Sequence, residues 1–122
     1  MPIGGTRIEN PIAAARAIDQ RAYALLETYA ALVEEAAEIV RDPHAPQALK
    51  RALAAAERAA TPAVETLGIA VRAYVSARAD VDATHSHSAA ATLVIAANRL
   101  NEAIDAAQAP IAELETLVRG GR

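Results

Sequence analysis

The sequence predicts an all-α protein, an antiparallel up-down-up bundle of three long helices that follows a short extended arm. Two observations carry this prediction. Alanine, the strongest intrinsic helix former, is the most abundant residue, and four of the five glycines lie at the chain ends. Apolar residues also recur at alternating steps of four and three, which is the pattern of the buried face of a bundle helix.

The first ten residues carry two glycines and a proline without any periodic pattern, so they predict an extended arm ahead of a helical domain spanning 11–122. Asn10 suits a helix N-cap and Pro11 suits the first helical position. Leu26, Val33 and Val40 widen the apolar stripe of this first helix, which should end at Asp42-Pro43. The stripe itself comprises Ile18, Ala22, Leu25, Tyr29, Leu32, Ala36 and Ile39.

A second helix is expected from about residue 46 to 82. Its apolar rhythm continues through Thr61-Pro62 without losing a step, which favours one helix kinked at Pro62. The alternative is a new helix that begins here, with Thr61 as its N-cap and Pro62 as its first residue. The stripe comprises Leu49, Leu53, Ala56, Ala60, Ala63, Leu67, Ala70, Tyr74, Ala77 and Val81.

The second turn is expected between Asp82 and Ser88, before a third helix that Gly120-Gly121 closes. This helix also keeps its rhythm through a proline, Pro110. Because Pro62 and Pro110 lie at similar distances from the second turn, an antiparallel pair would place them at one height. A shared bend or a gap is then expected there, unless both are unrelated, tolerated prolines. The stripe comprises Leu93, Ala97, Leu100, Ile104, Ala107, Ile111, Leu114 and Val118.

Charge and composition argue against several classes of partner. The net charge is −3, and the twelve basic residues are scattered, whereas nucleic-acid binding usually needs a basic face. No apolar stretch approaches the roughly 18 residues of a membrane span, and no secretory signal opens the chain. The polar helix faces are not enriched in lysine or arginine, which disfavours membrane-surface binding. We expect a cytoplasmic or particle-associated protein without nucleic-acid or membrane partners.

Four residues at the second turn form the one candidate metal site. Asp80, Asp82, His85 and His87 place two carboxylates and two imidazoles within eight residues, and such groups can bind a divalent cation. The alternative is a polar turn in which aspartate and serine cap helix ends and the histidines are solvated. A flexible turn also fixes ligand geometry poorly, which favours the second interpretation.

Other chemistry lacks its residues. No cysteine is present, no glutamate is followed three residues later by histidine, and no serine lies in a nucleophile elbow. No glycine-rich phosphate loop occurs either. Tyr29 and Tyr74 lie on the apolar stripes and are expected in the core, whereas Tyr23 lies off them. The sequence therefore predicts a non-enzymatic protein without a cofactor.

An apolar surplus gives the functional prediction. Ile69 lies outside its helix stripe, and Val94 and Ile95 make the start of the third helix apolar on more than one side. Contiguous exposed apolar residues usually mark interaction sites, although single surface aliphatics are ordinary. We expect a structural or assembly protein that contacts protein partners through this face and the arm, as a homo-oligomer or a subunit of a phage or other multi-subunit particle. The alternative is a bundle that binds a metal or a small apolar ligand.

Overall fold

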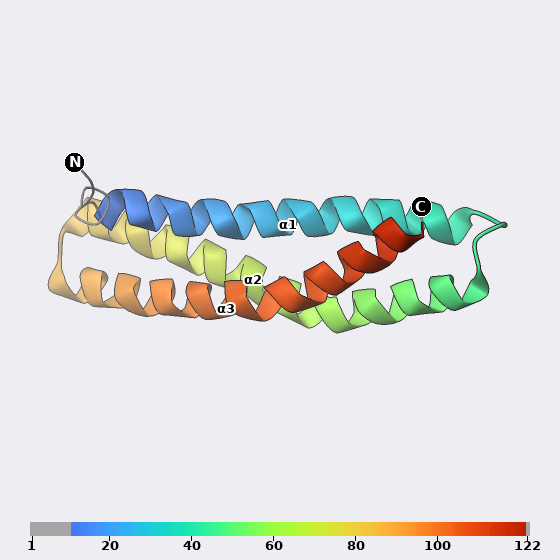
Figure 1. Ribbon diagram of the computed structural model, residues 1–122. Coiled ribbons are helices and arrows are strands. Elements are labelled where there is room, and N and C mark those ends of the chain that lie inside the picture. The colour runs from blue at the N-terminus through green and yellow to red at the C-terminus, as the bar shows by residue number, and fades with distance from the viewer. Residues whose placement is uncertain (1–10, 122) are drawn as a thin grey trace, which may run out of the picture.

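The computed structural model describes the chain from residue 11 to residue 121, with side chains from residue 18 onward. It contains three α-helices, α1 (Pro11–Arg41), α2 (Gln47–Thr84) and α3 (His87–Gly120). Helix α2 runs antiparallel to α1 and α3, so these residues form the expected up-down-up bundle (Figure 1). The arm predicted for residues 1–10 lies outside the described part of the chain.

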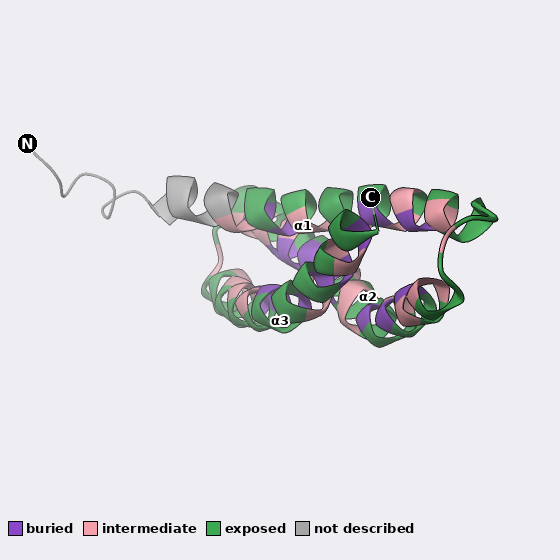
Figure 2. Cartoon of the chain, turned by 45° about the vertical axis from the view of Figure 1, so that its right-hand side comes forward, coloured by how far each residue is buried: buried purple, intermediate pink, exposed green. Residues whose placement is uncertain are grey.

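The core follows the predicted apolar stripes. Every stripe position in all three helices is buried or half-buried, and the outer faces are exposed (Figure 2). Val40, which was expected to widen the first stripe, is instead 45% exposed. Helices α2 and α3 pack most extensively against each other, and α1 contacts both. The largest fully buried side chains are Tyr74, Leu53, Leu67, Leu100, Ile104 and Leu114.

Both interior prolines lie within continuous helices. Pro62 is inside α2 and Pro110 is inside α3, so the alternative of a separate helix starting at Pro62 is wrong. Thr61 does not act as an N-cap, because its hydroxyl donates to the Glu57 carbonyl at 2.8 Å within the same helix. Helices α2 and α3 each bend near the middle of the rod, whereas α1 is straight (Figure 1). The bend keeps the stripes on both sides of each proline facing the core.

The C-terminal end of α3 packs against the end of α1 and the beginning of α2. Gly121 follows the helix with φ −82° and ψ −4°, so this C-cap is right-handed. A Cβ atom here would lie 2.7 Å from Leu49 Cδ2 and 3.2 Å from Ile39 Cδ1. Glycine is therefore favoured by the close approach of α3 to α1 and α2, and not by a left-handed backbone.

One ion pair interrupts the apolar core. Arg78 Nη1 of α2 lies 2.9 Å from Asp19 Oδ2 of α1, with side chains 29% and 10% exposed. The second oxygen, Asp19 Oδ1, is buried and has no hydrogen-bond partner among the described residues. The guanidinium also lies over the Tyr74 ring, 5.7 Å from its centroid. Burial raises the pKa of the Tyr74 hydroxyl, and Arg78 opposes part of this shift.

Candidate interaction surface

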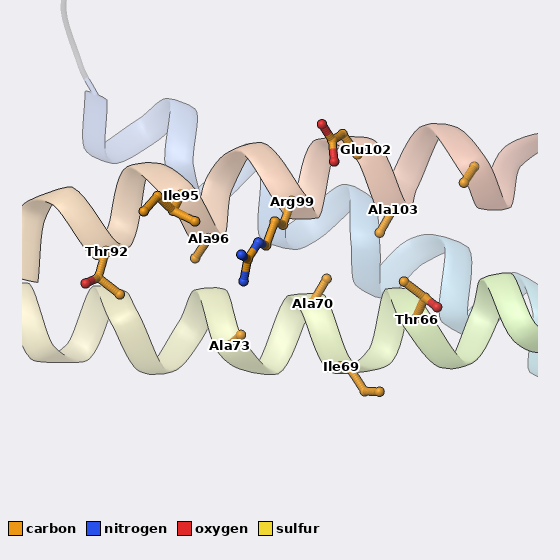
Figure 3. Close-up of a pocket in the computed structure, with 11 residues that line it drawn as sticks. Thr66, Ile69, Ala70, Ala73, Thr92, Ile95, Ala96, Arg99, Glu102 and Ala103 are labelled. Atoms are coloured by element: carbon orange, nitrogen blue, oxygen red, sulfur yellow. The ribbon is translucent and has the colours of Figure 1, made fainter.

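An apolar groove of about 520 Å³ runs between α2 and α3. We call it the α2–α3 groove, and α1 passes behind both of its helices in the view of Figure 3. Five alanines contribute the small side chains that leave this space open. The lining residues are Thr66, Ile69, Ala70 and Ala73 of α2, with Thr92, Ile95, Ala96, Arg99, Glu102, Ala103 and Ala106 of α3.

Two of the three residues predicted to form an interface line this groove. Ile69 is 62% exposed and Ile95 is 52% exposed, and they come from opposite sides of the groove (Figure 3). The third, Val94, is 60% exposed but is not among the lining residues. The prediction therefore selected a real exposed apolar surface, while the partner that it implies stays a prediction.

Helical geometry explains why these isoleucines are outside the core. Ile69 lies two positions after Leu67, which is in the core, and Ile95 lies two positions after Leu93, which is partly buried against the core. Two residues correspond to a rotation of about 200° in an α-helix, so the leucine and the isoleucine point to opposite sides. The same spacing that buries the leucines in this bundle therefore exposes the isoleucines.

Sequence reasoning missed the charged members of the surface. Arg99 and Glu102 line the α2–α3 groove, and both are exposed. In Figure 3 the Arg99 side chain extends toward α2, whereas the Glu102 side chain points away from it. Within residues 18–121, neither side chain forms an ion pair or a hydrogen bond. Their steps of four and three from Ile95 were a readable signal, because they mark a second stripe on α3.

The four residues of the predicted metal site do not converge. Asp80 and Asp82 lie in the last turns of α2, His85 follows the helix and His87 begins α3. All four residues are exposed. No three histidine, aspartate or glutamate residues in the described chain are grouped so that they could hold a metal ion. A separation of two residues turns Asp80 and Asp82 to opposite sides of α2. The structure therefore gives this site no support.

The second turn is shorter than predicted and serves to cap the helices. Only His85 and Ser86 lie between α2 and α3, instead of a turn from 82 to 88. His85 adopts a left-handed conformation with φ 53°, and its N–H donates to the Val81 carbonyl at 2.8 Å. The Ser86 hydroxyl accepts a hydrogen bond from the Ala89 N–H at 3.1 Å, as an N-cap should. His85 thus has a structural role as the C-cap of α2.

Comparisons with protein-family models, with curated proteins and with solved structures found no match. Among the described residues, no helix combines the length and the apolar character that crossing a membrane requires.

Proposed function

We propose that this chain is a non-enzymatic assembly protein that binds another protein chain through the α2–α3 groove. The single observation that carries the proposal is the exposure of Ile69 and Ile95 on the two sides of one apolar groove. Burying such side chains against a partner is favourable by about 1.5–3 kcal/mol each when the burial is complete. A structural subunit of a multi-subunit particle, for example a phage particle, is a role of this kind.

The shape of the groove supports a helical partner. Two antiparallel helices form its walls, and the alanines that line it let a third helix approach closely. The partner would add one more rod to the bundle and cover both isoleucines. An amphipathic helix in a groove of this kind is a common mode of protein recognition.

The experiment measures the native mass of the particle that contains this chain, purified from its source and analysed by light scattering. The wild-type particle is expected to exceed the 12.7 kDa of one chain. The double variant Ile69→Asp/Ile95→Asp should release the chain from the particle while helicity by circular dichroism is retained. A wild-type mass of one chain, or an unchanged mass in the variant, would refute the proposal.

The matched control places the same charges on another exposed apolar pair. Tyr23 and Val40 lie on α1, and each is 45% exposed. Neither lines the α2–α3 groove. The double variant Tyr23→Asp/Val40→Asp should therefore keep the wild-type mass. Equal loss of mass in both double variants would mean that added charge, and not the groove, causes dissociation.

The volume of the groove favours one alternative function. About 520 Å³ lies within the roughly 300–1,000 Å³ of small-ligand pockets, and the lining is mostly apolar. A small apolar molecule would raise the thermal midpoint of the chain without changing its mass. One result would favour this alternative over assembly. The wild type would bind an anilinonaphthalene dye while keeping the mass of a single chain, and Ile69→Asp/Ile95→Asp would not bind the dye.

A further inference from the structure

Helix α3 carries a second stripe that the bundle leaves uncovered. Thr92, Ile95, Arg99, Glu102 and Ala106 recur at steps of three and four, and all five are exposed in the α2–α3 groove. The core stripe lies on the other side of the helix and includes Leu100 and Ile104, which are fully buried. A helix with two stripes of this spacing can pack against neighbours on both sides.

The charges on this second stripe are self-complementary. Arg99 and Glu102 have opposite signs and lie on either side of Leu100 and Asn101. Neither has a charged partner among residues 18–121, and their side chains diverge in Figure 3. A two-fold axis between residues 100 and 101 would bring each of them opposite the other type in a second copy.

We infer that the occupant of the α2–α3 groove is α3 of a second copy of this chain, packed antiparallel about that axis. The inference rests on the proposed function, because it names the partner of the same surface. Residues equally distant from the axis face each other, so Arg99 faces Glu102 of the second copy. The symmetry repeats the pair, and each interface therefore contains two such ion pairs.

The apolar positions fit the same register. Ile95 lies five residues before Leu100, and Ala106 lies five residues after Asn101, so the axis places the large side chain opposite the small one. Such alternation lets two helices approach closely without collision. Ile69 of α2 flanks the incoming helix from the other side of the groove. Each groove is thereby covered by a single helix of the partner.

A parallel arrangement about the same stripe is disfavoured by both size and charge. It would set Ile95 against Ile95 and Arg99 against Arg99 of the second copy. Two like charges facing each other oppose association, and two bulky side chains hold the helices apart. The antiparallel register removes both conflicts, so the stripe itself specifies the direction of packing.

The test uses two charge reversals in the full chain, Arg99→Glu and Glu102→Arg, with mass and dissociation constant measured by light scattering across a dilution series. Each single variant should weaken self-association about ten-fold or more, because like charges then face each other twice. An equimolar mixture of the two single variants should form heterodimers, since the two acidic side chains of one variant then face the two basic side chains of the other. The double variant Arg99→Glu/Glu102→Arg should also associate nearly as the wild type does.

The controls change charge equally outside the groove. Arg58→Glu on α2 and Glu27→Arg on α1 alter exposed residues that do not line it. Both should keep the wild-type dissociation constant. Circular dichroism checks that every variant keeps its helices, which is expected because all substituted side chains are exposed.

The outcomes separate this inference from the proposed function. Recovery of dimers in the mixture supports the two-fold arrangement. A second outcome is that the mixture of Arg99→Glu and Glu102→Arg forms no dimers, while the wild type assembles and Ile69→Asp/Ile95→Asp does not. The groove is then an interface, and the two-fold arrangement is wrong. If the wild type alone is monomeric but its native particle is larger, the occupant is a different protein and the inference is refuted. If Ile69→Asp/Ile95→Asp leaves every mass unchanged, both fail.

Discussion

The ion pair between Asp19 and Arg78 allows an asymmetric prediction about stability. Removing one partner of a buried pair costs about 3–5 kcal/mol, because the other charge is left unpaired in the protein. The Asp19 side chain is 10% exposed, whereas the Arg78 side chain is 29% exposed, although its Nη1 atom is buried. Arg78 therefore keeps more contact with water than Asp19 does. Arg78→Met should therefore cost about 2–3 kcal/mol, and Asp19→Asn about 1 kcal/mol, after allowance for partial solvation.

The double variant Asp19→Asn/Arg78→Met completes the cycle. Because it removes both charges and leaves neither of them unpaired in the protein, we expect it to be more stable than Arg78→Met alone. Urea unfolding followed by circular dichroism gives each free energy of unfolding. Arg58→Met serves as the control, because Arg58 is an exposed arginine of the same helix.

Two results would refute this reasoning. The first is a cost for Asp19→Asn equal to or above that for Arg78→Met. The second is a cost for the double variant equal to the sum of its single substitutions, because residues in direct contact should not behave additively. The first result would mean that an unpaired Arg78 is solvated no better than an unpaired Asp19, and the second would mean that the two side chains act independently.

Three further predictions concern the turn, the core tyrosine and the interior proline. His85→Gly should raise the free energy of unfolding by about 1 kcal/mol in urea, because glycine adopts φ 53° without strain. Tyr74→Phe should reduce the loss of stability at alkaline pH. Because the pKa of the Tyr74 hydroxyl is raised in the folded state, its contribution to stability is present below the ordinary value of 10.0. That contribution is lost as pH rises through the pKa of the folded state. Pro62→Ala should stabilise the chain by about 1 kcal/mol in thermal unfolding, because it restores a helix hydrogen bond. This gain is smaller than the ~3 kcal/mol that an interior proline costs a straight helix, because packing against the other helices also fixes the bend.

Each of these predictions has a matched comparison. His87 is the first residue of α3 and does not have a positive φ, so His87→Gly should not stabilise the chain as His85→Gly does. Tyr23→Phe changes an exposed tyrosine and should leave the alkaline profile unchanged. Lower stability in His85→Gly, an unaltered profile in Tyr74→Phe, or a loss of stability in Pro62→Ala would contradict the respective argument.

The candidate surface was only partly predictable. Ile69 and Ile95 were identifiable because a large apolar residue off a regular stripe must be exposed or covered by a partner. The spacing of Arg99 and Glu102 from Ile95 was readable in the sequence, but an exposed charge on a helix is ordinary until its neighbours are known, so only the structure places them in the groove. Asp19 follows a stripe residue and resembles any surface aspartate in the sequence, and only the approach of Arg78 from α2 identifies it as part of a buried pair.

The amino-acid sequence determined the helices, their order and their buried faces, because these depend on local propensity and on the 3.6-residue period of each rod. It also indicated that the apolar rhythm continues through Pro62 and Pro110. Only the tertiary structure decided which outer faces lie side by side, since the rotation of one rod against the next depends on contacts between residues distant in the chain. The α2–α3 groove exists for that reason. The continuation of α2 to Thr84 likewise turns Asp80 and Asp82 to opposite sides of the helix, and the four residues do not form a metal-binding group in the described part of the chain.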